Sequence, residues 1–290
     1  MARLAYFGFR LLIFLFKLLP FWGLYRLSDG LYWLIYRGIG YRKKVVRQNL
    51  AQAFPNKTEA ERLVIEQRFY RFLFDLLLES IKGLSFSKKE LLKRQAHHTP
   101  DLPQGIIDKG RSALMVGGHY GNWEWGGLRA SSCTVAPVVI LYSPIKNQYI
   151  DTYLKDSRAK FDTRFVSYLE AMKAFRELSD QLTTFVLIAD QSPSNPGRAY
   201  WLPFLNQDTA VLRGPAIYAQ RYNMPLLFLS IKRLKRGYYS MGVEVLTENP
   251  RDYTPEELIG LYWKRLETLI EETPEWWLWS HRRWKHQRSE

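Results

Sequence analysis

The segment that most constrains the fold is residues 112–125, SALMVGGHYGNWEW. Its apolar run, residues 114–116, has the composition of a buried strand, and the run ends in two glycines. Glycines permit backbone conformations that side chains forbid, and they let a ligand approach the main chain closely. A turn with His119 and a helix that begins before Glu124 would follow. The segment therefore predicts a strand–turn–helix unit, as in α/β proteins.

Strand-like and helix-like patterns alternate along the rest of the chain. Thr58 and Glu61 form a capping box before a helix that should run to about Gly83. The expected strands are 135–142, a short one near 165, 184–189, 225–234 and 238–246, and the expected helices are 147–160, 169–178, 215–222 and 254–274. No Pro/Gly/Ser-rich linker divides this region. We expect a single α/β domain over residues 41–290, with a mostly parallel central sheet flanked by helices.

The N-terminus is apolar but repeatedly interrupted. Residues 4–36 are rich in Leu, Ile, Phe, Trp and Tyr, yet no unbroken apolar run reaches the ~20 residues of a transmembrane helix. Arg3, Arg10 and Lys17 are seven positions apart, which places them on one helical face. The pattern favours a helix in the membrane interface, while a short tilted span and an ordinary buried helix remain open. We expect residues 1–40 to form a membrane anchor.

The charge of the chain points to an anionic partner. Its formal net charge is +14, which suits membrane phospholipid, a phosphorylated glycolipid, an acidic carrier protein or nucleic acid. The closing segment 276–285, WWLWSHRRWK, combines aromatic rings with positive charge, as at a membrane interface or an anionic lipid head group. We expect no nucleic-acid partner, because no nucleic-acid fold signature is present. The single cysteine, Cys133, lies in no metal-like spacing, so no metal site is expected.

His119 and Glu124 are a candidate base and its supporting carboxylate. From mid-helix positions five apart they would point about 140° from each other. They can pair if His119 lies in the turn before the helix and Glu124 in the first turns. Glu124 would then hold one ring nitrogen while the other removes a proton from a hydroxyl that attacks an acyl carbon. The alternative is a structural histidine satisfied by a buried carboxylate.

The sequence GGHYGNWE resembles the His-x-x-x-x-Glu motif of the lysophospholipid acyltransferase superfamily. Its Asn-Trp-Glu ending is similar to the lipid A late-acyltransferase (lauroyl/myristoyl acyltransferase) branch. Residues 41–62, 187–193, 202–228 and 276–285 resemble further elements of this branch in the same order. The phospholipid branch's Phe-Pro-Glu-Gly element is missing after the base motif. The resemblance implies a glycerol-3-phosphate acyltransferase-like fold.

The same resemblance implies a membrane-associated O-acyltransferase of lipopolysaccharide biosynthesis. It would transfer a fatty acyl chain from an acyl carrier protein thioester to a hydroxyl of a lipid A precursor. The expected location is the inner membrane, on anionic membrane lipid, with the catalytic domain facing the cytoplasm. No cofactor is expected, because a thioester is already activated. Acylation of another glycolipid or aminolipid, and a non-catalytic lipid-binding protein, are the alternatives.

The resemblance also extends the set of expected site residues. Arg158 is the third expected catalytic residue, because the family places a basic residue in its stretch and arginine can hold phosphate or stabilise an oxyanion. Asp190 and Gln191 end a predicted strand, at the edge where open α/β sheets carry their sites, and could position a sugar hydroxyl or orient Arg158. The expected substrate-binding residues are Gly118, Asn122, Asp190, Gln191, Arg198 and Arg213.

Overall fold

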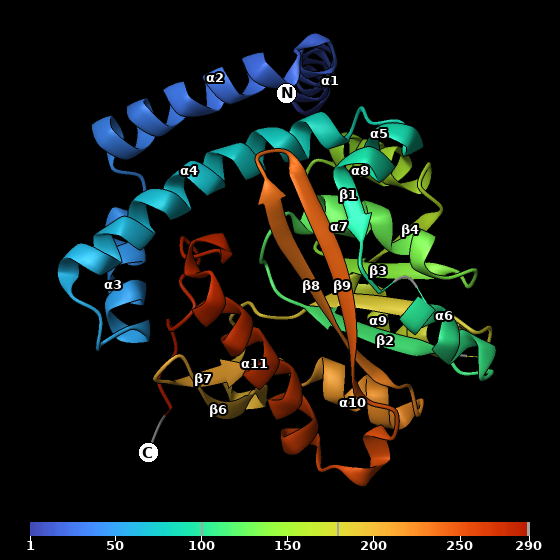
Figure 1. Ribbon diagram of the computed structural model, residues 1–290. Coiled ribbons are helices and arrows are strands. Elements are labelled where there is room, and N and C mark those ends of the chain that lie inside the picture. Colours follow the sequence, from blue (N-terminus) through green and yellow to red (C-terminus); the bar gives the residue numbers. More distant parts are fainter. Residues whose placement is uncertain (100, 179, 289–290) are drawn as a thin grey trace.

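A mostly parallel sheet of seven strands forms the centre of the molecule (Figure 1). The computed structural model describes residues 1–99, 101–178 and 180–288. The strands of this sheet are β1 (Gln95–His97), β2 (Ala113–Gly117), β3 (Val138–Tyr142), β4 (Thr163–Ser167), β5 (Thr184–Ile188), β8 (Leu226–Lys235) and β9 (Tyr238–Thr247). Their order is β1-β9-β8-β2-β5-β3-β4, and all neighbours are parallel except the antiparallel hairpin β8–β9. The expected α/β domain with a mostly parallel sheet is confirmed.

Alternate residues of each strand enter hydrophobic cores on opposite faces of the sheet. Leu114 and Leu187 lie in the first core, and Met115 and Val186 lie in the second. Helices α9 (Ala171–Leu178), α10 (Gly214–Arg221) and α11 (Pro255–Glu272) cover the first core, and α5 (Lys88–Arg94), α6 (Asp101–Asp108) and α7 (Trp123–Arg129) cover the second. Parallel strands need this cover on both faces, which is why their apolar runs are continuous.

Capping residues mark three of the predicted helix starts. Thr58 and Glu61 exchange side-chain and backbone hydrogen bonds at the start of α4 (Glu59–Gly83), and Thr254 and Glu257 do the same for α11. Asn147 caps α8 (Gln148–Ala159). The strands expected between residues 114 and 246 are present, with boundaries displaced by a few residues. Local sequence therefore determines most of these elements.

Several short elements were not predicted. The chain after β5 forms a separate antiparallel hairpin, β6 (Tyr200–Phe204) and β7 (Gln207–Val211), and β1 adds a short strand at the edge of the main sheet beside β9. The short 3₁₀ turns are η2 (Ala130–Cys133), η3 (Tyr168–Glu170), η4 (Pro196–Arg198), η5 (Pro250–Asp252) and η6 (Pro274–Trp276).

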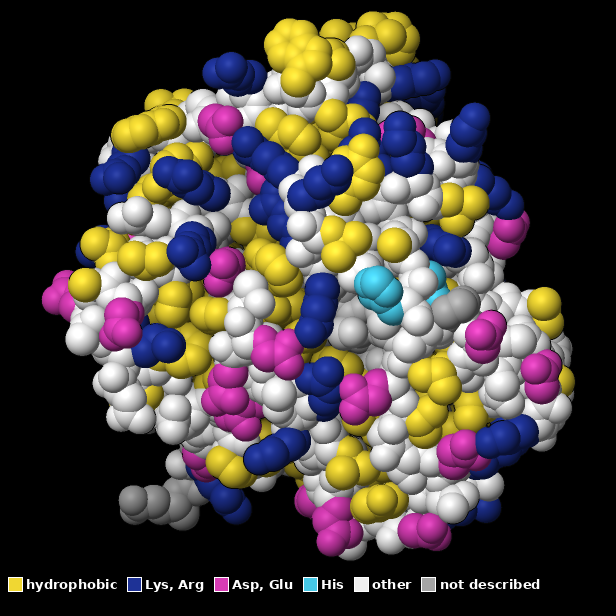
Figure 2. All heavy atoms as spheres, in the orientation of Figure 1, with side chains coloured by type: hydrophobic (Ala, Val, Ile, Leu, Met, Phe, Trp, Pro, Cys, Tyr) yellow, Lys and Arg dark blue, Asp and Glu magenta, His cyan; other side chains and the backbone are white. Residues whose placement is uncertain are grey.

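The N-terminal helices pack on α4. They are α1 (Ala2–Leu18), α2 (Phe21–Leu31), the π-helix η1 (Tyr32–Ile39) and α3 (Lys43–Ala53), and α1 and α2 lie at the top of the view (Figure 1). Many large apolar side chains of the first three are more than half exposed, and we call them the N-terminal apolar face: Leu4, Phe7, Leu11, Phe14, Leu15, Leu18, Trp22, Trp33, Leu34 and Ile39. Figure 2 shows hydrophobic side chains there, with Lys and Arg among them. None of the described helices has the length and apolarity that a membrane crossing requires.

Two basic residues of α1 point toward α8. Arg3 donates a hydrogen bond to the Tyr149 hydroxyl at 3.1 Å, and the Arg10 guanidinium lies 4.9 Å from the ring centre of Tyr153. The side chains of Arg3 and Arg10 therefore dock α1 on the rest of the protein, whereas the exposed apolar residues face outward.

Candidate active site

His119 lies just beyond the carboxyl end of β2. Strands β2 and β5 are adjacent and parallel, with Gly117 opposite Ile188, so the second residue after each strand, His119 and Asp190, reaches the same edge of the sheet. Nδ1 of His119 lies 2.6 Å from Oδ1 of Asp190, and the backbone N–H of His119 donates to Oδ2 at 2.9 Å. The pair lies where parallel α/β sheets carry their sites.

Asp190 is buried in surroundings that favour its ionised form. Burial by itself would raise the pKa of Asp190, but the charge of His119 and hydrogen bonds from His119 and Trp277 hold this pKa below its ordinary value. The indole Nε1 of Trp277 donates to Oδ2 at 2.8 Å. With a carboxylate at Nδ1, that nitrogen carries the ring proton and Nε2 carries the lone pair.

A cavity of about 670 Å³ lies beside the His119 ring, a size common for small-molecule sites. Its walls are largely apolar. They include neighbouring residues of β5 that belong to the cores on opposite faces of the sheet, Val186 and Leu187. Gln191 also lines it, and the amide nitrogen of Gln191 lies 3.2 Å from Nε2 of His119. The Gln191 amide therefore occupies the position next to Nε2 of His119.

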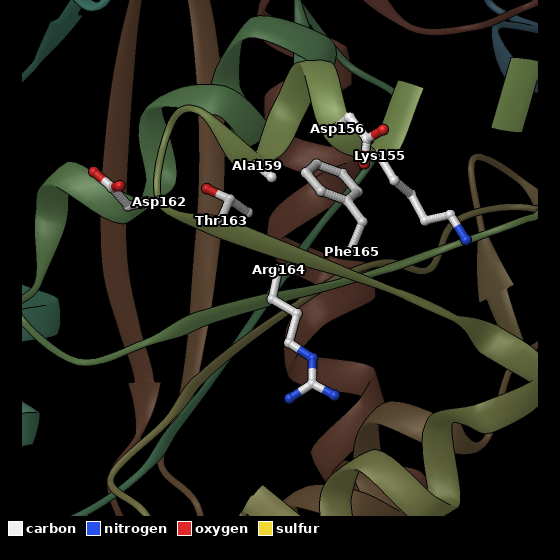
Figure 3. Close-up of a pocket in the computed structure, with 7 residues that line it drawn as sticks. All are labelled: Lys155, Asp156, Ala159, Asp162, Thr163, Arg164 and Phe165. Carbon is white, nitrogen blue, oxygen red and sulfur yellow. The ribbon is translucent and has the colours of Figure 1, made fainter. Parts of the chain in front are cut away.

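A smaller hollow of about 370 Å³ lies between α8 and β4 (Figure 3). Lys155 and Ala159 of α8 form part of it, and Figure 3 shows Phe165 rising from β4 toward α8 while Arg164 extends on the other side of the strand. Phe165 lines both hollows, and only the larger of the two is lined by His119. We therefore take the larger cavity as the candidate active site.

Glu124 and Arg158 form a second pair in this cavity. Nη2 of Arg158 lies 2.5 Å from Oε2 of Glu124, and the guanidinium lies 4.9 Å from the ring centre of Phe165. The predicted support of His119 by Glu124 is therefore wrong, because Asp190 occupies Nδ1 and the Glu124 carboxylate pairs with Arg158. The sequence placed His119 before α7 and Glu124 in its first turn correctly. It did not indicate which strand end lies beside β2.

Gly118 and Asn122 shape the site from inside the protein. A Cβ atom at Gly118 would come within 2.7 Å of Leu266 and 3.2 Å of Oδ2 of Asp190, so a side chain there would displace the carboxylate. Asn122 is buried, and its Oδ1 caps α7 by accepting from the N–H of Trp125 at 3.0 Å. Its Nδ2 donates to Glu79 at 2.9 Å. The Asn122 amide therefore makes its hydrogen bonds inside the protein, whereas a substrate-binding role was expected for it.

Glu79 of α4 is a supporting residue that the sequence did not reveal. Its buried carboxylate accepts hydrogen bonds from the Tyr25 hydroxyl at 2.9 Å, the Tyr239 hydroxyl at 2.6 Å and the Asn122 amide. Burial raises the pKa of Glu79 to about 6, although the hydrogen bond from Tyr239 and the charge of Arg233 oppose this rise. Glu79 thereby ties α4 to the loop that follows His119.

Arg198 and Arg213 lie in the segment that follows β5, and both are exposed. Arg213 precedes α10, and its guanidinium lies 4.5 Å from the ring centre of Tyr200. Its neighbours Leu212 and Gly214 line the cavity, so Arg213 is at the rim. Arg198 ends the 3₁₀ turn η4, and it does not line the cavity.

Cys133 and His97 meet elsewhere, with Sγ 3.0 Å from Nε2 of the ring. Burial raises the pKa of the Cys133 thiol to about 12 and lowers the pKa of His97 to about 4. Both groups are therefore neutral at pH 7. Across the residues that the structure describes, no group of three or more His, Cys, Asp or Glu side chains could hold a metal ion.

The fold and the site define an α/β protein in which a histidine, paired with a buried aspartate, lies beside a largely apolar cavity. The sequence model of the bacterial lipid A biosynthesis acyltransferases matches residues 2–286, and the chain belongs to this family. It is therefore an acyltransferase of lipid A biosynthesis, and the resemblance drawn from five sequence stretches is confirmed. No curated protein matches the chain.

Proposed function

We propose that this acyltransferase moves a fatty acyl chain from an acyl carrier protein thioester to a hydroxyl of a lipid A precursor, borne by an existing acyl chain. His119 is the general base, and Asp190 is the carboxylate that supports it. One observation carries the proposal: His119 has Nδ1 on a buried carboxylate, while its ring lines a largely apolar cavity of about 670 Å³. An apolar cavity suits a fatty acyl chain, and an unprotonated imidazole nitrogen suits proton removal from a hydroxyl.

The chemical step needs one base and one anion-stabilising group. Nε2 of His119 removes the hydroxyl proton as the acceptor oxygen attacks the thioester carbonyl carbon, and Gln191 moves aside to admit this oxygen. The carbon–sulfur bond then breaks, and the leaving thiolate takes the proton back from His119. Asp190 stabilises the imidazolium formed in between. Arg158 is the cationic group in the cavity that can stabilise the developing oxyanion, and Glu124 holds its guanidinium in place.

The N-terminal apolar face supports association with the inner membrane. Its side chains are exposed, and their spacing on α1 at positions 4, 7, 11, 14 and 18 forms one stripe along the helix. A surface of this kind is stable when it is buried in the interface of a bilayer. In this proposal residues 1–40 lie in the cytoplasmic leaflet, and the domain 41–290 takes the acyl carrier protein from the cytoplasm.

The proposal is tested by assaying His119→Ala with a lipid A precursor and an acyl carrier protein thioester in phospholipid vesicles. Mass spectrometry of the lipid product should show a rate lower by roughly 100- to 10,000-fold. His98→Ala, at an exposed histidine, is the matched control and should behave as wild type. A folded His119→Ala protein that acylates the precursor at the wild-type rate would refute the proposal. Transfer to another glycolipid only would refute the proposed acceptor.

A further inference from the structure

The carboxy-terminal segment, residues 273–286, holds the loop that follows His119. The N–H of Gly121 donates to the carbonyl of Trp276 at 3.0 Å, and Tyr120 forms an isolated β-bridge with Trp277. The hydroxyl of Tyr120 donates to the carbonyl of Thr273 at 3.1 Å. Two residues directly after His119 are therefore fixed by the end of the chain.

The same segment holds the loop of Asp190. The indole of Trp277 donates to Oδ2 of Asp190 at 2.8 Å. The N–H of Ser192 donates to Nε2 of His281 at 3.2 Å, and Nε2 of His286 lies 2.8 Å from the carbonyl of Pro193. The carboxy-terminal segment thus links the two strand-end loops whose side chains form the His119–Asp190 pair.

The burial of this segment corrects its interpretation as a membrane or lipid head-group contact. Trp277, Trp279 and Arg283 are each at most 3% exposed, so they pack inside the protein. Arg282 and Lys285 are exposed, and the buried Arg283 and partly buried Trp284 lie between them in sequence. Trp277 and Trp279 are therefore part of the interior, and Trp277 contacts Asp190.

Arg283 adds a buried positive charge on the same side. One guanidinium nitrogen donates to the carbonyl of Ala210 at 2.6 Å, and the group lies 4.8 Å from the ring centre of Trp263. Burial lowers the pKa of Arg283 to about 10, and the charge of Asp190 opposes this change. The charge of Asp190 therefore acts on the buried guanidinium of Arg283.

We propose that Trp277, in the carboxy-terminal segment, is a positioning residue for the His119–Asp190 pair. The inference rests on the proposed function, in which His119 is the base. Oδ2 of Asp190 accepts hydrogen bonds from Trp277 and from the His119 backbone, which orients Oδ1 toward Nδ1. Without the indole N–H the carboxylate is free to turn, and the imidazole loses its fixed partner.

Trp277→Phe is the test variant, because phenylalanine keeps a ring in the aromatic cluster and removes the donor. Trp279→Phe is its matched control: Trp279 is also buried and packs edge-to-face against Trp277, but its indole donates to the carbonyl of Pro274. Trp277 does not line the cavity, so the substrate KM should be unchanged. We expect kcat of Trp277→Phe to fall about 10- to 100-fold, as when other hydrogen-bonding groups that orient a functional histidine are removed. The kcat of Trp279→Phe should stay within about threefold of wild type.

A second readout does not depend on acyl transfer. The Nδ1 proton shared by His119 and Asp190 should give a low-field ¹H resonance, assigned by its loss in His119→Ala. We expect Trp277→Phe to broaden or shift this resonance and Trp279→Phe to leave it unchanged. Equal kcat and equal spectra in the two tryptophan variants would overturn the inference. Failure of the proposed function would differ, because His119→Ala would then lose the resonance but keep acyl transfer.

Discussion

Two carboxylates lie near His119, and they differ in burial and in partner. Asp190 has a side chain only 2% exposed and bonds the ring, whereas the Glu124 side chain is 34% exposed and bonds Arg158. A buried carboxylate fixed by several donors can orient an imidazole, while a carboxylate that faces a cavity can hold a cation for substrate. In the proposed mechanism the two acids therefore have separate tasks, and Glu124 acts through Arg158.

We expect Glu124→Gln and Arg158→Gln to be strongly non-additive. Each change removes the same ion pair, so the double variant should lose little more kcat/KM than the worse single variant, with a coupling free energy of roughly 1–3 kcal/mol. The exposed pair Lys232 and Glu272 is the control, and its glutamine variants should leave kinetics unchanged. Independent, additive losses at Glu124 and Arg158 would contradict a joint role.

At the scale of elements, helix α4 positions the short helix α7 through a buried carboxylate. Glu79 binds the side chain of Asn122, the cap of α7, and its backbone carbonyl accepts from the Trp125 indole at 3.0 Å. Asp75 and Arg233 also act on Glu79, with opposite effects on its pKa. The entry to α7, and with it the direction of Glu124, depends on this contact between helices that are distant in sequence.

Glu79 should give the protein a specific pH dependence. Its pKa is raised from 4.5 to about 6, so the folded state holds this proton more tightly than the unfolded chain. Glu79 contributes its full stabilisation below pH 4.5, and this contribution falls as the pH rises through 6. At neutral pH the free energy of unfolding is therefore lower by about 2 kcal/mol. In denaturant unfolding, Glu79→Gln should remove this decline, and Glu170→Gln, at an exposed carboxylate, should retain it. Parallel stability curves for wild type and Glu79→Gln would contradict the assignment.

The sequence predicted helices and strands better than it predicted which of them lie side by side in the fold. Caps such as Thr58 and Thr254 are local signals, so helix starts were found correctly. His119 was placed at a strand end for the same reason. That Asp190 is its partner depends on β5 lying beside β2, and strand order is set by packing of the whole domain. Trp277 lies 87 residues from Asp190 in sequence, so no spacing rule relates them.

At the scale of the whole molecule, the N-terminal helices place an apolar surface on one end of the enzyme. Arg3 and Arg10 turn toward α8, so the outward side of α1 is mainly apolar. The contact between α1 and α8 also connects this end to the helix that carries Arg158. Attachment through this face would therefore bring a lipid acceptor close to the candidate active site.

Attachment by the apolar face should resist salt. At 1 M salt the Debye length is about 3 Å, so a contact held by charge alone would be released, whereas inserted leucines and aromatics would stay. We expect full-length protein to stay with membranes in a high-salt wash, and the triple variant Phe7→Ser, Leu11→Ser and Phe14→Ser to be released. Arg3→Gln with Arg10→Gln is the control. Quantitative recovery of the wild-type protein in the supernatant would contradict the inserted face.

The single-turnover rate of Asp190→Asn tests the role of the His119–Asp190 pair most directly. The amide would present an N–H group to Nδ1 and so favour the tautomer that carries its proton on Nε2, where the base must be free. We expect acyl transfer to slow by roughly 10,000-fold, as when the acid of a serine-protease triad is changed to its amide. A folded Asp190→Asn enzyme within about tenfold of the wild-type rate would contradict the role of the His119–Asp190 pair.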